Sequence, residues 1–391
     1  MNASIAFKSI IAGAAAAGAV SAGASLAAAG EYVQTNLVSD ISGLAAVTDS
    51  SLKNPWGVSF LPGSPFWVSN QGSDTSTLYT VHGGTDVSKN GLTVAIPTTS
   101  GGPQGPTGQV ANTNSSSFML SDGSSALFIF ANLNGQISAW NPGLSPITKA
   151  VPAWTTPGAV YTGLAINQAD TMLYAANDSA GTIDVFNSSF KPLSTSGFVT
   201  PTAIKNLDLT PFNVEDFGGN VYVTYAPMGH AAQTSATAGE GAVAEFSESG
   251  AFEKIIVPGG AGEPLASPWG LAWAPASFGK FGGDLLVGNF SYADSGIDAI
   301  NPANGALVGT IPINVGGSNT AGGLWTLVFG GGGKDGNPNV LYFTDGINGE
   351  HDGLFGAVAF VPEPSTWIMM LAGFGGLALA ARRRRLARAT G

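Results

Sequence analysis

An internal repeat constrains the fold of this chain more than any other feature of its sequence. Each copy begins with an aromatic or apolar anchor beside glycine. A turn rich in Gly, Pro and Asp follows, and then an apolar strand that in most copies ends in Asn or Asp. The pattern occurs six times, spaced by roughly 50–57 residues, with anchors at 54–60, 105–108, 161–166, 210–214, 267–273 and 322–329.

Each copy continues with further strands and has no helical segment between them. A third segment alternates polar and apolar residues, as in 136–141, 182–187, 242–246 and 296–301, and a fourth, outer strand follows, as in 92–96 and 306–311. One such sheet cannot cover both of its faces, whereas six arranged radially bury them against each other. The sequence therefore predicts an all-β fold, a six-bladed β-propeller. The alternatives are seven blades, with an irregular one in 85–120, or a pair of β-sandwiches.

The repeat also predicts where particular residues lie. Gly57, Gly163 and Gly270 belong on the innermost strands, where blades crowd the axis. We expect Trp56, Trp269 and Trp325 to pack between blades as core residues. Ring closure should pair the first strand, 32–37, with the last blade at 357–360.

The two ends of the chain have the composition of targeting signals rather than of a folded domain. Residues 1–29 contain Lys8, a short Ala-rich apolar run from 10 to 20 and an Ala27-Ala28-Ala29 cleavage pattern, which is typical of a secretory signal peptide. The alternative is an uncleaved anchor. At the other end, Pro362-Glu363-Pro364 precedes an apolar run from 367 to 381, and Arg382, Arg383, Arg384 and Arg385 follow it. A cluster of Arg beside a membrane span keeps that side in the cytoplasm, so we expect the body, 30–361, to lie outside the inner membrane.

Composition narrows the class of partner. Only 10% of residues are charged while 44% are hydrophobic, which argues against a coiled coil or a disordered chain, and the absence of Cys excludes thiolate chemistry. Between the two ends the chain carries 24 acidic and eight basic residues, a net charge near −16. Phosphate backbones and anionic lipids would repel such a body, so we expect no binding of nucleic acid.

The C-terminal segment resembles the PEP-CTERM sorting signal of Gram-negative bacteria. The resemblance covers residues 362–391 and all three of its parts in order: Pro-Glu-Pro, apolar span and Arg cluster. It implies that an exosortase, a membrane enzyme similar to cysteine transpeptidases, cuts at the motif and releases or re-anchors the protein. The inner membrane would then be a transient partner through the C-terminal span. The alternative is a plain C-terminal anchor.

The body resembles a family of uncharacterised exported bacterial proteins that often end in this signal. The resemblance rests on residues 55–58, 267–271, 330–333, 341–346 and 352–356, and it implies no established activity. More distantly, the repeat is similar to NHL and gluconolactonase-type propellers.

Catalytic motifs are largely missing from the sequence. It has neither a G-x-S-x-G elbow nor an H-E-x-x-H helix, and Gly330–Gly333 departs from a phosphate-binding loop at Val328 and Asp335. The three histidines, His82, His230 and His351, fall in separate repeats without the spacing of zinc ligands, and we expect them in exposed loops.

One constellation suggests a metal. The strand-ending Asn70, Asn132, Asn177, Asn289 and Asp345 occupy equivalent positions, and Glu215 lies in the repeat that lacks such a residue. Ring symmetry would bring the strand ends to one face near the axis, where amide and carboxylate oxygens suit Ca²⁺ or another divalent metal. The similarity to gluconolactonase-type propellers implies that such a metal would polarise a lactone carbonyl. The alternative is that these side chains cap strands and bond to turns.

Two functions follow from this reading. The first is a non-catalytic exported propeller of the cell envelope or matrix that binds or organises exopolysaccharide, protein or metal. The second is a divalent-metal-dependent hydrolase or lyase, similar to a lactonase, with its site at the mouth of the axial channel.

Overall fold

The computed structural model describes residues 31–99, 103–194, 196–362, 371 and 373–377. The predicted signal peptide, the Glu363-Pro364 part of the sorting motif and the cluster Arg382–Arg385 lie outside these residues. In the C-terminal segment, Leu371 and residues 373–377 are helical. No helix within the described residues is both long enough and apolar enough to span a bilayer.

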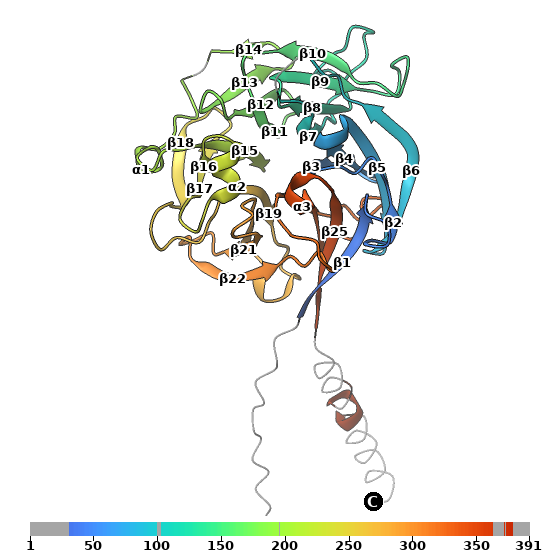
Figure 1. The fold of residues 1–391 in the computed structure, drawn as a ribbon, viewed down its shortest axis with the longest axis vertical. Helices are drawn as coiled ribbons and strands as arrows, with labels where there is room; N and C mark the ends of the chain where they lie inside the picture. The colour runs from blue at the N-terminus through green and yellow to red at the C-terminus, as the bar shows by residue number, and fades with distance from the viewer. Residues whose placement is uncertain (1–30, 100–102, 195, 363–370, 372, 378–391) are drawn as a thin grey trace, which may run out of the picture. The chain divides into compact units, whose positions relative to one another are not determined.

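Five antiparallel sheets of four strands and one sheet of five strands form the predicted six-bladed propeller (Figure 1). The strands of blades 1 to 3 are β3 (Pro55–Ser59), β4 (Phe66–Asn70), β5 (Thr75–His82), β6 (Asp86–Ala95); β7 (Pro106–Ala111), β8 (Phe128–Asn132), β9 (Gln136–Trp140), β10 (Val151–Thr155); and β11 (Tyr161–Ile166), β12 (Met172–Asn177), β13 (Thr182–Asn187), β14 (Pro192–Leu193). Those of blades 4 and 5 are β15 (Leu209–Phe217), β16 (Asn220–Pro227), β17 (Ala242–Ser247), β18 (Phe252–Val257); and β19 (Pro268–Trp273), β20 (Leu285–Asn289), β21 (Gly296–Ile300), β22 (Leu307–Pro312).

Blade 6 contains strands from both ends of the propeller. Its order is β23 (Leu324–Phe329), β24 (Val340–Asp345), β25 (Leu354–Val361), β1 (Glu31–Ser39) and a short parallel strand β2 (Val47–Thr48). The predicted closure is confirmed: Tyr32 lies opposite Phe360 and Thr35 opposite Ala357. The seven-bladed and sandwich alternatives are wrong, because residues 85–120 supply the outer strand of blade 1 and the inner strand of blade 2.

Short helices interrupt the loops where the sequence predicted only turns. They are η1 (Gln71–Ser73), α1 (Thr202–Lys205), α2 (His230–Ser235), η2 (Gly279–Phe281) and α3 (Ile347–Glu350). Of these, η1, α2 and α3 follow the second strand of blades 1, 4 and 6, so they lie on the same face of the propeller.

The hydrophobic core is divided among the blade interfaces. The described residues form seven apolar clusters, six of them between successive pairs of blades and the seventh at the centre. The inner strands approach closely enough to require glycine, as predicted. A Cβ at Gly163 would lie 2.0 Å from the Asn213 side chain, and one at Gly270 would lie 2.1 Å from the Trp325 carbonyl oxygen. Any larger side chain would push blades apart.

Candidate functional site

Aromatic side chains fill the centre of the ring. Trp56, Trp269 and Trp325 lie near the starts of the inner strands of blades 1, 5 and 6, and they form one cluster with Phe212 and Phe290. Trp56 and Trp325 stack with ring centroids 3.4 Å apart, and Trp56 meets Trp269 edge-on at 6.1 Å. The tryptophans are buried as predicted. Trp325 contacts Trp56 and Trp269 between neighbouring blades, as expected, whereas Trp56 and Trp269 also meet across the axis.

The Trp269 side chain extends across the axis of the propeller. Its Nε1 donates to the carbonyl oxygen of Thr162 at 2.9 Å, which links blade 5 to blade 3. The small glycines of the inner strands bring the blades close, and the indoles occupy the space that remains. The indoles therefore occupy the axis at this level of the described propeller, close to the face that carries η1, α2 and α3.

A polar group of side chains lies on that face, and we call it the axial polar cluster: Asn54, His230, Tyr292 and Glu350. The Glu350 carboxylate is its centre and is only 11% exposed. It accepts hydrogen bonds from Asn54 Nδ2 at 3.0 Å and from Tyr292 Oη at 2.8 Å, and it pairs with His230 Nε2. Three side chains from blades 1, 4 and 5 thus meet at one carboxylate of blade 6.

The cluster is tied to the aromatic centre beneath it. Asn54 accepts a hydrogen bond from Trp325 Nε1 at its Oδ1, 3.0 Å away, and donates from Nδ2 to Gln71 and Glu350. Both Asn54 (φ 41°) and Glu350 (φ 66°) have a left-handed backbone conformation, which residues other than glycine adopt uncommonly. Strain of this kind persists only where surrounding contacts enforce it, and it concentrates at functional sites.

The electrostatics of the cluster favour an oriented imidazole. The hydrogen bond to Glu350 raises the pKa of His230 above 6.5, with burial opposing it. Burial and the nearby Glu350 carboxylate raise the pKa of the Tyr292 hydroxyl. The His230 side chain is 62% exposed, so a carboxylate fixes one edge of a ring that solvent reaches. Such a pair can bind a polar ligand or transfer a proton.

The strand-ending asparagines mostly bond within their own blades. Each occupies the end of a second strand, and three donate from Nδ2 to a side chain on the third strand: Asn70 to Thr77 (2.9 Å), Asn177 to Asp184 (3.0 Å) and Asn289 to Asp298 (2.9 Å). Asn132 instead donates to the Pro97 carbonyl oxygen at 3.4 Å. Within the described chain, no hydrogen bond joins any two residues of the predicted metal set.

Asp345 is the exception among these positions. In blades 1, 3 and 5 the bonded partner lies two residues beyond the third-strand residue opposite the asparagine. Asp345 lies opposite Leu354, so the same position in blade 6 is Gly356, which has no side chain. Within the described residues, neither carboxylate oxygen of this fully buried side chain has a hydrogen-bonding partner. Burial holds the pKa of Asp345 well above its usual value; the Gly322 backbone opposes the rise and Glu350 adds to it.

Glu215 lies away from the strand ends. The register pairs it with Tyr222, next to the turn that joins β15 to β16, whereas the strand ends lie at the other end of the sheets. In blade 4 Tyr225 takes the strand-end position, because it lies opposite Pro211 as Asn289 lies opposite Pro268. Burial raises the pKa of Glu215 to about 8. Within the described residues, no group of three or more His, Cys, Asp or Glu is placed to hold a metal ion.

Sequence reasoning missed the axial polar cluster. It placed His230 in an exposed loop and did not single out Asn54, Tyr292 or Glu350. The available signal was positional: His230, Tyr292 and Glu350 each follow the second strand of a repeat by a few residues, as the strand-ending residues do. The loops of one face therefore carried information that the search for metal-ligand spacing did not use.

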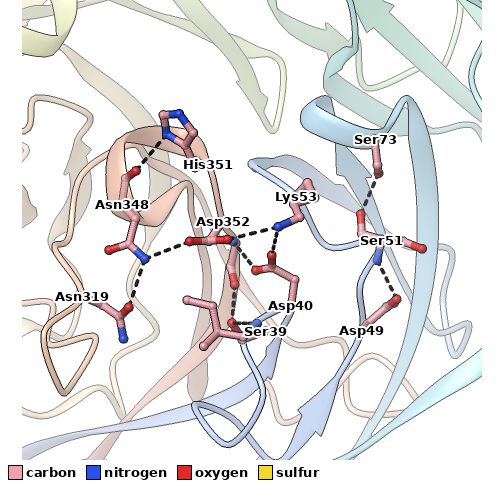
Figure 2. Close-up of polar contacts among 12 residues, drawn as sticks. Ser39, Asp40, Asp49, Ser51, Lys53, Ser73, Asn319, Asn348, His351 and Asp352 are labelled. Carbon is pink, nitrogen blue, oxygen red and sulfur yellow. Dashed lines mark hydrogen bonds and ion pairs between the residues drawn. The ribbon is translucent and has the colours of Figure 1, made fainter.

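A second polar network closes the ring near the last blade (Figure 2). Lys53 pairs with Asp40 and, at 3.1 Å, with Asp352, whose other oxygen accepts from Asn348 Nδ2 at 3.0 Å. The Asn348 bond and Lys53 lower the pKa of Asp352, whereas burial raises that of Asp40 against the pull of Lys53. The Gly353 N–H donates to Asp40 at 2.8 Å, so these contacts tie the loop after β1 to blade 6.

Two cavities lie away from the axial polar cluster. One of about 940 Å³ is lined by residues of blades 2, 3 and 4, among them Trp154, Asp184 and Lys205. The other, of about 1000 Å³, borders Tyr32 and Asn314. No residue of the axial polar cluster lines either one, so size alone does not locate that cluster.

The fold and the axial face define a six-bladed β-propeller whose centre is closed by aromatic rings. The chain belongs to the same family as "Uncharacterized protein L690" of Acanthamoeba polyphaga mimivirus, with 30% identity over 285 residues that cover 70% of this chain and 72% of that protein. It is similar to "Uncharacterized protein R648" of the same virus, with 28% identity over 342 residues, 82% of this chain and 78% of that protein.

The C-terminal match is specific to a short segment. Residues 360–385 match the PEP-CTERM protein-sorting motif, which confirms the predicted resemblance. The motif implies processing by an exosortase and sorting to the cell surface. Pro362, the first residue of Pro-Glu-Pro, is exposed directly after β25.

Solved structures are similar to this chain at low sequence identity. A structural genomics protein of unknown function from Bacteroides thetaiotaomicron has a TM-score of 0.49 and 11% identity, covering 84% of this chain and 76% of that chain. A catalytically inactive virginiamycin B lyase from Staphylococcus aureus, solved with quinupristin, has a TM-score of 0.48 and 11% identity, covering 85% of this chain and all of that chain.

Proposed function

We propose that the protein is an exported, exosortase-sorted propeller of the cell envelope or extracellular matrix that acts without catalysis, as a binding or structural protein associated with exopolysaccharide. Residues 1–29 would direct export, 30–361 would form the propeller, and 362–391 would hold the chain in the inner membrane until Pro362-Glu363-Pro364 is processed. The product then stays at the outer surface or is released.

The closed axis is the observation that carries this proposal. Rings of Trp56, Trp269 and Trp325 occupy the centre, so the propeller offers faces and grooves rather than an enclosed reaction chamber. A net charge near −16 between the two ends repels anionic polymers, which favours neutral glycans as partners.

A sedimentation assay tests this function. The secreted form is mixed with a neutral polysaccharide such as dextran, with the exopolysaccharide of the producing strain, or with alginate as an anionic control. We expect it to sediment with dextran and with the strain's exopolysaccharide, and to remain in solution with alginate. Equal recovery with all three polymers, or with none, argues against the proposal.

A second function is favoured by the unpaired Asp345 below the axial polar cluster. A metal-dependent hydrolase or lyase, similar to a lactonase, would use that face. Of the predicted ligands, Asn70, Asn132, Asn177 and Asn289 direct their amide N–H groups into bonds of their own, and Glu215 lies at the other end of its sheet. Asp345 is the remaining carboxylate, so Ca²⁺ or another divalent metal would also need amide or backbone oxygens.

Turnover distinguishes the two functions. The secreted protein is assayed on gluconolactone with added Ca²⁺ or with EDTA, beside the Asp345→Asn variant. The enzyme hypothesis expects hydrolysis that EDTA and Asp345→Asn both abolish. A rate equal to the uncatalysed one in every sample supports the binding function.

A further inference from the structure

The sorting motif and the closing strand of the propeller share residues. The ladder between β1 and β25 runs to its very end: Glu31 lies opposite Val361, and Tyr32 lies opposite Phe360. The match to the PEP-CTERM motif begins at residue 360. Phe360 and Val361 therefore belong both to the motif and to a paired strand, and Figure 1 shows β1 and β25 side by side to their ends.

The inner of these two pairs is firmly held. The Tyr32 ring lies 5.5 Å from that of Phe360 and stacks on Phe281 at 4.9 Å, measured between ring centroids. Its hydroxyl donates to the Phe278 carbonyl oxygen at 2.8 Å and accepts from the Phe281 N–H at 3.1 Å. Phe360 is thus anchored through Tyr32 to the loop that carries η2 in blade 5.

The outer pair is weakly held by comparison. Val361 is 46% exposed, and Glu31 is exposed as well. No spacer separates this pair from Pro362, because Val361 is the last residue of β25. An enzyme that cuts a peptide needs several residues of extended, unpaired chain, and it reaches folded segments only when they open.

We propose that pairing between β1 and β25 restrains processing of the sorting motif, so that the exosortase acts on the fraction of chains in which Glu31–Val361 and Tyr32–Phe360 have opened. The inference rests on the proposed sorting function and concerns access to the motif. The strand that closes the ring at the N-terminal end thereby controls how fast the C-terminal end is released.

The test follows the full-length chain in a strain that contains an exosortase, with the loss of the C-terminal segment measured by pulse-chase. One variant carries a flexible Gly-Ser linker inserted between Val361 and Pro362. Another is Tyr32→Ala, which removes the anchor of Phe360. We expect both to be processed roughly two- to fivefold faster than the natural chain, in line with the loss of one or two cross-strand pairs.

A reversible lock provides the opposite perturbation. The chain has no Cys, so Glu31→Cys combined with Val361→Cys introduces a single possible disulfide across the outer pair. We expect the oxidised double variant to be processed several times more slowly, and reductant to restore the rate. Either cysteine alone, and the same linker inserted after Gly123 in an exposed turn, serve as controls and should match the natural chain.

The outcomes separate this inference from the function on which it rests. If the natural chain is processed but neither the linker nor the disulfide changes its rate, pairing does not restrain the enzyme and the inference is wrong. If no chain is processed in the presence of the exosortase, the proposed sorting function fails and the inference fails with it.

Discussion

Trp56 and Trp325 stack face to face across the junction of the first and last blades, with 3.4 Å between their ring centroids. Further out, the first strand of the propeller, β1, pairs with the last, β25, within the sheet of blade 6. Ring closure is therefore made twice, once by aromatic packing at the axis and once by strand pairing.

The axial rings should contribute strongly to stability. We expect Trp325→Ala to lower the free energy of unfolding by about 3–5 kcal/mol, because it removes a fully buried indole and leaves a cavity. Urea denaturation measures the change. Phe252→Ala, at a ring that is 50% exposed, is the control and should lose far less. Equal losses in the two variants would show that the axis is not a core.

The inner-strand glycines should tolerate no side chain. In Gly270→Ala the new methyl group would lie 2.1 Å from the Trp325 carbonyl oxygen, a backbone atom that cannot rotate away. We expect a loss of about 1–3 kcal/mol in unfolding free energy. Gly91→Ala, where nothing lies within 4 Å, is the matched control and should change stability by less than about 0.5 kcal/mol. A tolerated Gly270→Ala would contradict the close approach of blades 5 and 6.

Asp345 should make stability fall as pH rises. Its folded-state pKa lies above the unfolded value of 3.8, so the folded chain holds the proton more tightly between the two values. The unfolding free energy is then highest below pH 3.8 and declines as pH rises toward the folded-state pKa. Asp345→Asn removes this decline, and at neutral pH we expect it to gain about 1–3 kcal/mol relative to the natural chain. Parallel pH profiles of the two proteins in thermal denaturation would refute the assignment.

The Glu350–His230 pair predicts a titration that NMR can follow. The His230 pKa should lie above 6.5 in the natural protein and return toward 6.5 in Glu350→Gln. Because the folded-state pKa of His230 is raised, the pair adds to the unfolding free energy below pH 6.5. This added stability is lost as the pH rises through the folded-state pKa of His230. Tyr292→Phe should leave most of the shift in place. Glu253→Gln, an exposed carboxylate in β18, should leave all of it. An unchanged His230 pKa in Glu350→Gln would mean that the pair does not form in solution.

Lys53 should be worth more than an ordinary surface lysine. Lys53→Ala leaves Asp40, whose side chain is 3% exposed, without its cation. We expect a loss of about 1–3 kcal/mol at neutral pH, since an unpaired buried charge is costly. Lys205→Ala, at an exposed lysine of α1, is the control for the same denaturation experiment. Similar small changes in both variants would indicate that the network in Figure 2 adds little.

Most of the fold could be predicted because every repeat has the same need to bury an apolar sheet face. A short alternating strand with one apolar face needs a neighbour, and six copies plus a spare strand at residue 31 leave closure as the solution. The contacts that Trp269 makes across the axis could not be predicted in this way. Whether an indole points between blades or across the axis depends on the radius of the ring, which is a property of all six blades together.

The candidate site was less accessible to sequence reasoning for a related reason. Glu350 contacts His230 and Asn54 only because loops of different blades converge. No local spacing in the sequence therefore indicates that these residues lie together. The peculiarity of Asp345 appears only with the register in hand, because it depends on Gly356 standing where other blades carry Thr77, Asp184 or Asp298. The register also removed the reason for grouping Glu215 with the strand ends.

The pairing of Glu31 with Val361 has a consequence for the architecture as a whole. Two ends that finish on neighbouring strands can be bridged by a turn of a few residues, and the chain can then be opened in an exposed turn such as the one at Gly123. Such a circular permutant would keep every sheet and every blade interface while moving the start of synthesis from blade 6 to blade 2. The order in which the blades occur along the sequence is therefore independent of the ring that they form.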